Sequence, residues 1–184
     1  MVTVLAFDTA TTYGAVCAVS GGGRARAERA GDVLAAVDSL VLDPRALEGI
    51  VVGRGPGSFT SIRIGLAVAR TLSLALGIPV AGATTLDAYA EGTPVLDAKR
   101  GEVFTPGPRV ARPEELDVDG LLLVGDGAVR YRETFEAAGA TVPPDDDPAH
   151  VPDPFLLIER SGAFGEAALV EPLYVREPDA RPRA

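Results

Sequence analysis

The sequence has little of the chemistry on which metalloenzymes and serine hydrolases depend. Its 184 residues include one cysteine, Cys17, one histidine, His150, and no tryptophan. A zinc site needs three or four Cys, His or acidic ligands at suitable spacing, and a Ser-His-Asp triad would have to use the single histidine. His150 follows a stretch rich in proline and aspartate, residues 143–148, which is typical of a loop, so we expect it to be solvent-exposed. We therefore expect no catalytic residue and no metal site.

Long hydrophobic runs and targeting signals are also missing. The most apolar stretch, residues 62–80, is interrupted by two arginines and a proline, so it predicts a buried helix rather than a membrane span. The first four residues carry no basic segment, and Asp8 interrupts the apolar run that follows, so no signal peptide is expected. A lone Cys17 cannot form an internal disulfide, which fits a reducing cytoplasm.

Clusters of positive charge are absent as well. The net charge is −9, and the 17 basic residues are scattered along the chain. A nucleic-acid-binding protein needs basic residues gathered against the phosphates, so we do not expect this chain alone to grip RNA. The acidity suits a more basic protein partner, but ordinary solubility is the favoured explanation.

What the sequence does contain is the pattern of an α/β protein, in which apolar strands alternate with amphipathic helices. Residues 84–87, Thr-Thr-Leu-Asp, resemble a capping box that opens a short helix ending at Gly92. The pattern predicts strands at 2–7, 13–20, 24–29 (an edge strand), 50–52, 80–81, 94–97, 102–104 and 121–124, and helices at 32–42, 61–76 and 130–138.

The order of these elements repeats along the chain. A strand ending in Asp8, a hairpin, and a strand leading through Gly53-x-Gly55 into a helix are followed by a shorter copy with Asp97 and Gly125-x-Gly127. Such repetition indicates duplication, although a strand-Gly-x-Gly-helix unit also arises by chance in α/β proteins. We predict one lobe at residues 1–93, a reduced second lobe at 94–170, and a C-terminal tail at 171–184.

The stretch from Gly53 to Thr60 is the most informative motif. Three glycines and a proline separate a buried strand from a helix, and a hydroxyl from Ser58 or Thr60 can cap that helix. Backbone amides at a helix start suit an anion such as phosphate, but the Gly-Lys-Ser/Thr of a P-loop is missing. Two interpretations of this stretch therefore stay open: a structural turn and a phosphate-binding loop. The candidates for a phosphate or nucleotide loop are Asp8, Gly55, Pro56, Gly57 and Ser58.

Two aspartates, Asp8 and Asp97, end strands that continue into hairpins. In actin-like kinases such carboxylates orient a metal-bound nucleotide, and a glycine close behind lets the hairpin approach the phosphates. Here no glycine follows until Gly14, which disfavours phosphoryl transfer. Asp8 either serves a site or accepts hydrogen bonds from its own turn.

Taken together, these motifs resemble the TsaB (YeaZ) family, a subunit of the bacterial machinery that makes threonylcarbamoyladenosine in tRNA. The Gly-Pro-Gly-Ser-Phe-Thr stretch is the most specific match. Two regions depart from the family pattern: the chain after Arg24 is trimmed, and residues 105–116, rich in proline and glycine, replace longer strands. The matching segments occur in family order at residues 5–11, 53–65, 97–104 and 172–176.

The resemblance implies an actin-like fold of two RNase H-like lobes, the second reduced, and a non-catalytic role. Family members pair with a catalytic relative, TsaD, whose paired metal-binding histidines this chain cannot supply. With the ATPase TsaE, they support transfer of threonylcarbamoyl from its adenylate to a tRNA adenosine beside the anticodon. The resemblance thus implies no cofactor of the chain's own, ATP or ADP only at the level of the complex, indirect contact with tRNA, and no membrane.

The resemblance also places the partner surface on the first two helices, where a TsaD-like protein or a second copy of this chain would dock. The candidate residues are Leu34, Val37, Arg63 and Arg70. The second helix carries two apolar stripes, and the extra stripe either meets a partner or packs on the first helix in the core. An actin-like small-molecule phosphotransferase and a glycoprotease-like peptidase are the disfavoured alternatives. We expect the chain alone to have no transferase, kinase or peptidase activity.

Overall fold

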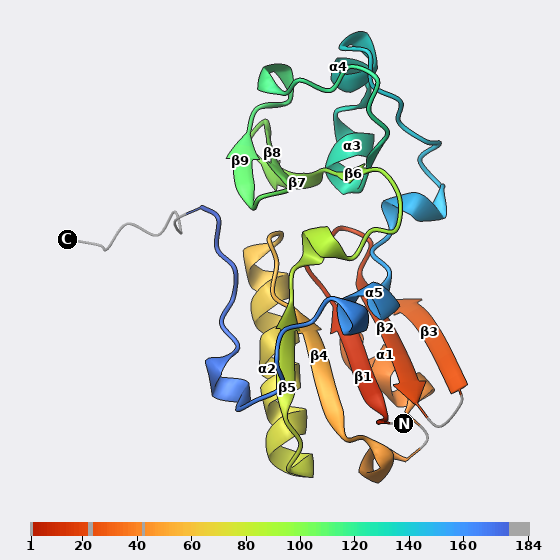
Figure 1. Cartoon of the computed structure of the whole chain (residues 1–184), viewed down its shortest axis with the longest axis vertical. Helices are drawn as coiled ribbons and strands as arrows, with labels where there is room; N and C mark the ends of the chain where they lie inside the picture. Colours follow the sequence, from red (N-terminus) through yellow and green to blue (C-terminus); the bar gives the residue numbers. More distant parts are fainter. Residues whose placement is uncertain (1, 22–23, 42, 177–184) are drawn as a thin grey trace, which may run out of the picture.

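The first lobe of the protein is organised around a five-stranded sheet. The computed structural model describes residues 2–21, 24–41 and 43–176 (Figure 1). The strand order is β3-β2-β1-β4-β5; β2 is antiparallel to both its neighbours, whereas β1, β4 and β5 run parallel. This is the RNase H-like arrangement that the resemblance implied, and β3 lies at the predicted edge. The strands are β1 (Val4–Asp8), β2 (Ala15–Gly21), β3 (Arg24–Ala30), β4 (Gly49–Gly53) and β5 (Val80–Ala83).

Both faces of this sheet are covered, because alternate side chains of a strand point to opposite sides. Leu5 and Phe7 of β1 belong to a core cluster with buried residues of helices α1 and α2. Val4 and Ala6 belong to a second cluster on the other face, closed by Leu157 of α5. The helices are α1 (Val33–Leu40), α2 (Phe59–Leu76) and α5 (Pro154–Glu159).

The two predicted helices of the first lobe both begin at side-chain caps, and α2 begins at Phe59, two residues before the predicted start. The Asp32 side chain accepts a hydrogen bond from the Leu34 amide at 2.9 Å, and Ser58 Oγ caps α2 by accepting from the Ser61 amide at 3.4 Å. Helix α2 ends at Gly77, whose φ of +68° suits glycine. The predicted end of α1 at Leu42 lies outside the described residues.

Helix α2 is, in the described part of the chain, the one helix that could cross a membrane by length and composition alone. Core helices of globular proteins pass the same test, so this is weak evidence of a span. In the structure, Ile62, Leu66 and Ala69 of α2 are buried against the sheet. The prediction of a buried helix therefore holds only for the face of α2 that covers the sheet, because Ile64 and Leu74 on its other side are exposed.

The second lobe repeats the first in reduced form. Strand β10 pairs in parallel with β6, as β4 pairs with β1. Asp97 lies in β7 of the β7–β8 hairpin, and Asp8 lies at the end of β1 in the β1–β2 hairpin, so the predicted strand end at Asp97 is wrong because β7 continues to Lys99. A core cluster around Val95, Leu123 and Phe135 fills this lobe. Its elements are β6 (Thr93–Pro94), β7 (Leu96–Lys99), β8 (Glu102–Thr105), β9 (Arg109–Ala111), β10 (Leu123–Val124), α3 (Asp126–Arg130) and α4 (Arg132–Ala137).

Three local predictions need correction here. The helix predicted at 130–138 begins earlier, at Asp126, and is interrupted at Tyr131. The strand predicted at 121–124 is only two residues long. The predicted capping box forms no side-chain bond, and a single 3₁₀ turn stands in place of a helix. The 3₁₀ turns are η1 (Pro44–Ala46), η2 (Thr85–Asp87), η3 (Pro113–Glu115), η4 (Pro148–His150) and η5 (Ala167–Leu169).

After the second lobe, the chain returns to the first. Helix α5 lies on the sheet against β1, β2 and β4, and Gly165 exchanges two backbone hydrogen bonds of 3.0 Å with Val80 of β5 (Figure 1). Turn η5 then packs along α2. The predicted lobe limits stay a proposal; α5 and η5, which fall within the predicted second lobe, pack on elements of the first.

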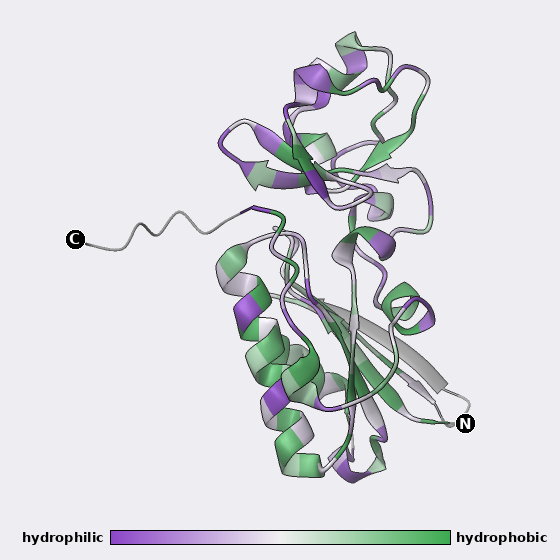
Figure 2. Cartoon of the chain, turned by 60° about the vertical axis from the view of Figure 1, so that its left-hand side comes forward, coloured by the Kyte–Doolittle hydropathy of each residue, from purple (hydrophilic) through white to green (hydrophobic). Residues whose placement is uncertain are grey.

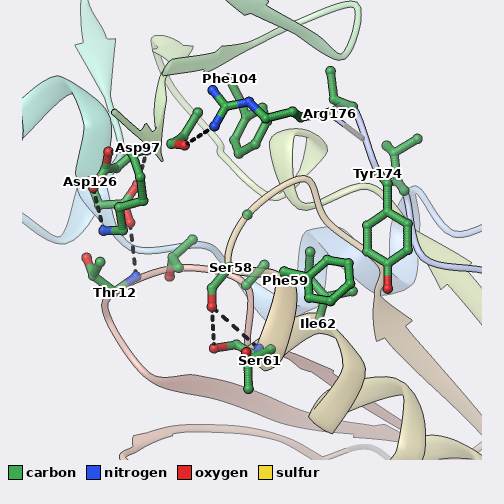
Figure 3. A pocket seen from close by; sticks show the side chains of 18 of the residues that line it. Thr12, Ser58, Phe59, Ser61, Ile62, Asp97, Phe104, Asp126, Tyr174 and Arg176 are labelled. Carbon is green, nitrogen blue, oxygen red and sulfur yellow. Dashed lines mark hydrogen bonds and ion pairs between the residues drawn. The ribbon is translucent and has the colours of Figure 1, made fainter. Parts of the chain in front are cut away.

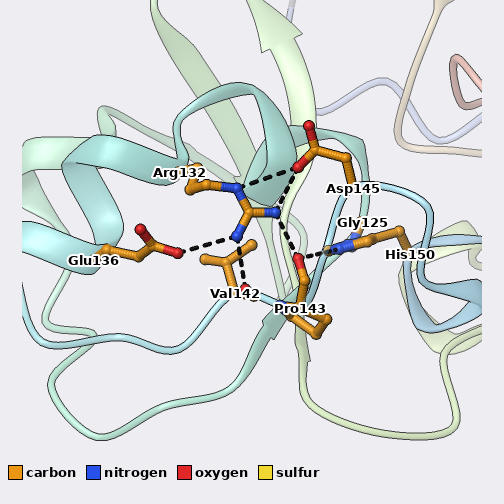
Figure 4. A network of polar contacts seen from close by, with 7 residues as sticks. All are labelled: Gly125, Arg132, Glu136, Val142, Pro143, Asp145 and His150. Carbon is orange, nitrogen blue, oxygen red and sulfur yellow. Dashed lines mark hydrogen bonds and ion pairs between the residues drawn. The ribbon is translucent and has the colours of Figure 1, made fainter.

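The environment of His150 contradicts the prediction of a solvent-exposed loop histidine. His150 is 0% exposed; its Nδ1 accepts from the Gly125 amide at 3.1 Å, so its Nε2 carries the proton and faces the Pro143 carbonyl oxygen at 3.1 Å (Figure 4). Arg132 ties down the same loop through Asp145 at 2.6 Å and through backbone carbonyls. The proline and aspartate pattern indicated a loop correctly, but it could not show that the loop folds back onto the lobe.

Candidate functional site

A cavity of about 840 Å³ lies between the two lobes (Figure 3). Its walls come from both lobes. An actin-like architecture has its cleft in the same place, between the lobes. The lining segments are residues 10–12 after β1, 57–63 at the start of α2, 97–100 in the β7–β8 hairpin, Phe104, Asp126, and residues 173–176 near the C-terminus.

The Gly53–Thr60 loop forms one wall of the cavity, and its glycines permit close backbone approach. A Cβ at Gly57 would overlap the Ala10 carbonyl oxygen and lie 2.7 Å from the Ala10 Cβ. A Cβ at Gly55, where φ is +97°, would meet Ile62 at 2.6 Å. These contacts support the structural-turn interpretation. Of the five predicted loop residues, Gly57 and Ser58 line the cavity, whereas Asp8, Gly55 and Pro56 are not among its lining residues.

The Asp8 side chain is buried and accepts hydrogen bonds from neighbouring residues. It is 1% exposed; its Oδ1 accepts from the Ala10 amide and its Oδ2 from the Thr85 hydroxyl, both at 2.6 Å. Burial raises the pKa of this carboxyl, although the hydrogen bonds from Thr85 and Ala10 oppose the rise. A Cβ at Gly53 would overlap the carboxylate, so the glycine makes room for it. This geometry favours the turn-stabilising interpretation of Asp8.

Asp97, the matching residue of the second lobe, faces the cavity and is surrounded by cations. Its carboxylate contacts Lys99 Nζ at 2.5 Å and Arg130 at 3.4 Å, and it accepts from the Lys99 amide at 2.8 Å. Both cationic side chains are more than half exposed, so their charge is partly screened by water. Asp97 is thus a paired carboxylate and not a free base.

Asp126 is a site residue that the sequence reasoning missed. Its Oδ1 accepts from the Asp97 amide at 2.9 Å, and its Oδ2 accepts from the Thr12 amide of the first lobe at 3.0 Å. One carboxylate therefore joins the hairpins of both lobes at the cavity (Figure 3). An aspartate between two glycines directly after a strand was the available signal, but its partner lies 114 residues away.

An aromatic pair at the start of α2 was also missed. The rings of Phe59 and Tyr174 stack with centroids 4.8 Å apart (Figure 3). The Arg63 guanidinium lies 3.9 Å from the Phe59 ring centre, and its Nε donates to the Tyr174 hydroxyl at 2.9 Å. The segment around Tyr174 carried part of the family resemblance, yet the sequence gave no sign that it returns to α2.

The predicted partner residues separate into three groups. Leu34 is 55% exposed on the outer side of α1. Val37 is 8% exposed and packs in the core, which corrects its assignment to a partner surface, because it lies on the inner face of the same helix. Arg63 bonds Tyr174, and Arg70 donates to the Val170 carbonyl at 2.9 Å, so both arginines hold the chain's own C-terminal region.

The outer sides of α1 and α2 carry a small groove and exposed apolar side chains. A small groove of about 280 Å³ lies between the start of α1 and α2, and Val33 and Ile64 line it. Ile64 is 51% exposed, and Leu74 further along α2 is also exposed. Apolar side chains left uncovered on neighbouring helices are typical of a surface that meets another protein.

Within the residues that the structure describes, no group of three or more His, Cys, Asp or Glu side chains could hold a metal ion. Cys17 is buried in the core of the first sheet. His150 uses both ring nitrogens for backbone contacts. The candidate site is therefore the interlobe cavity itself, with the α1–α2 surface beside it.

The fold and the cleft define an actin-like protein built from two RNase H-like lobes. The structure of YeaZ from Pseudomonas aeruginosa matches it with a TM-score of 0.76 and 25% identity, over 95% of this chain and 100% of that one. A family model described as TsaD, tRNA N6-adenosine threonylcarbamoyltransferase, matches residues 24–106.

Two sequence relatives complete the comparison. An uncharacterised protein of Mycobacterium tuberculosis is 37% identical over 209 residues, covering 99% of this chain and 95% of the relative. The tRNA threonylcarbamoyladenosine biosynthesis protein TsaB of Bacillus subtilis is 40% identical over 82 residues, covering 38% of this chain and 36% of that protein. The chain belongs to the TsaB (YeaZ) family.

Proposed function

We propose that this chain is a non-catalytic subunit of the machinery that makes threonylcarbamoyladenosine in tRNA. The observation that carries the proposal is its membership of the TsaB family, whose curated members are named for threonylcarbamoyladenosine biosynthesis. In this role the chain supports a TsaD-like enzyme, works alongside a TsaE-like ATPase in the cytoplasm, and meets tRNA only through the complex.

The chemistry of the cleft supports a non-catalytic role. Asp8 is enclosed by its own turn, and Asp97 is paired with cations. Asp126 accepts hydrogen bonds from two backbone amides. The single histidine, His150, is buried and does not line the cavity. A general base needs a side chain within reach of substrate and free to accept a proton. We infer that the chain has no cofactor of its own and that ATP or ADP acts at the level of the complex.

The outer sides of α1 and α2 are the proposed docking surface for the TsaD-like enzyme or for a second copy of this chain. Leu34 and Ile64 are each more than half exposed, and Ile64 lines the groove between the helices. Figure 2 shows hydrophobic residues recurring along the visible side of α2, interrupted by a few hydrophilic ones. Burying such apolar area against a partner is the usual source of binding energy.

The test is co-purification with the TsaD-like protein of the same genome. Leu34→Glu places a charge on the proposed surface, so we expect the variant to fold normally and to lose the partner. Leu121→Glu is the matched control, because Leu121 is a 40% exposed leucine on the second lobe. The control should co-purify like the unmodified chain. Retained binding by a folded Leu34→Glu, Ile64→Glu double variant would show that this surface is not the docking site.

Size-exclusion chromatography of the chain alone tests whether a second copy of this chain, rather than a TsaD-like enzyme, occupies that surface. A second copy docked there would give a dimer that Leu34→Glu converts to a monomer. A dimer that survives this substitution would use another face.

A further inference from the structure

The segment Leu173–Arg176, called here the strap, lines the interlobe cavity. Its first half is anchored to the first lobe. The Leu173 amide donates to the Arg54 carbonyl, at the end of β4, at 2.7 Å. Tyr174 stacks on Phe59 and accepts from Arg63.

The second half of the strap is anchored to the second lobe. Val175 packs against the apolar cluster that contains Ala98 and Phe104 of the β7–β8 hairpin. Arg176, labelled in Figure 3, donates to the Ala98 carbonyl at 3.2 Å. It also forms an ion pair with Glu102. These four consecutive residues thus bridge the two lobes, although they are far in sequence from the residues that they contact.

We propose that the strap is a releasable latch that joins the two lobes and covers the apolar wall of the cavity. Its anchors are of the kind that break without global unfolding. Tyr174 and Phe59 are each 37% exposed, so water competes for their contact. The Arg176 and Glu102 side chains are 27% and 31% exposed, although the Arg176 Nη2 atom itself is buried. Each lobe keeps its own core cluster when the strap leaves, because those clusters do not depend on Tyr174 or Arg176.

Release changes the cavity in a defined way. Ala98 and Phe104 line it and are now almost fully buried, and Val175 is packed against their cluster. Removal of the strap exposes that wall. The Asp126–Thr12 hydrogen bond, which joins the two hairpins, does not involve the strap and stays in place. The latched form therefore has a covered cavity, and the released form an open one.

The experiment measures access to the wall with a thiol probe in the full-length chain. Ala98→Cys places a thiol under the strap, and its reaction rate with a small aromatic disulfide reagent is followed. The parent chain, with Cys17 buried in the core, gives the background rate. Adding Tyr174→Ala together with Arg176→Ala should speed the reaction roughly tenfold or more, because the latched state no longer protects the thiol.

The matched control is Arg70→Ala. Arg70 holds the Ala167 and Val170 carbonyls, just upstream of the strap, to the first lobe only. This variant should leave the rate within about twofold, since local opening elsewhere does not expose the wall. Equal rates with and without Tyr174 and Arg176, or equal acceleration by Arg70→Ala, would overturn the latch.

A second measurement needs no engineered cysteine. Hydrogen exchange of the peptide spanning residues 96–105 is compared in the unmodified chain and in the Tyr174→Ala, Arg176→Ala variant. The latch predicts faster exchange in this hairpin and unchanged exchange in the β1–β4 core. Unchanged exchange in the hairpin of a folded variant contradicts it.

Discussion

The two lobes share one plan but are held together by different forces. The first lobe has a continuous five-stranded sheet whose two faces are both buried under helices. The second lobe has two small sheets, and polar clamps from Arg132, His150 and Asp126 supplement its smaller core. A reduced copy of a fold loses apolar area and relies more on hydrogen bonds that must each be satisfied.

The aspartates at equivalent positions show the same divergence. Asp8 is sealed inside by Ala10 and Thr85, whereas Asp97 faces the cavity between Lys99 and Arg130. The shared position therefore does not carry a shared role. The following substitutions probe this difference between the lobes.

The largest effect is expected from a charge in the first-lobe core. Val37→Glu buries a carboxylate with no partner in the cluster under α1, which should lower the free energy of unfolding by about 3–5 kcal/mol. Chemical denaturation followed by far-UV circular dichroism measures the loss. A Val37→Glu variant as stable as the unmodified chain would show that α1 can turn away from the sheet, and the core placement would then be wrong.

Gly57→Val tests the loop that separates β4 from α2. The added side chain would overlap the Ala10 carbonyl, so we expect destabilisation of about 1–3 kcal/mol by thermal unfolding. Gly31→Val is the matched control, since a Cβ there meets nothing within 4 Å. Equal melting temperatures for the two variants would refute the close-approach argument.

Arg132→Ala addresses the second lobe. Arg132 bonds Val142, Asp145 and Glu136 and is only a quarter exposed, so its removal should cost about 1–2 kcal/mol. Hydrogen exchange should rise around residues 142–150 and stay unchanged in the first-lobe sheet. Uniform acceleration across both lobes would mean that the lobes unfold as one unit and that the clamp is not local.

The smallest effect is the pH dependence contributed by Asp8. Because burial raises its folded-state pKa above the ordinary value of 3.8, the unfolded chain binds fewer protons between the two values. Stability from this group is therefore highest at acidic pH and declines as pH rises through the folded pKa. Asp8→Asn should remove that decline, seen as a difference between the two stability curves. Parallel curves would show that Asp8 titrates normally.

Much of the fold followed from patterns that are local in sequence. Buried strands, the glycine-rich turn and the Ser58 cap each depend on a few neighbouring residues, and they were predicted correctly. The site was harder, because Asp126 meets Thr12 across 114 residues and Tyr174 meets Arg63 across 111. Periodicity marked Val37 as apolar but could not say whether its stripe faces the sheet or a partner.

The prediction that His150 is solvent-exposed was wrong for a related reason. Proline and aspartate mark a loop, yet they do not reveal that Arg132 draws that loop onto the lobe or that the ring accepts from Gly125. Burial of a polar side chain depends on partners that only the tertiary structure supplies.

Threonylcarbamoyl transfer to tRNA, measured in a reconstituted reaction, tests the central claim most directly. The chain alone should give no modified adenosine, and the TsaD-like enzyme with its other components should gain activity when this chain is added. The Asp8→Asn variant should support the enzyme as well as the unmodified chain does, because Asp8 serves its own turn. Turnover by the purified chain alone that disappears with Asp8→Asn would contradict the non-catalytic assignment.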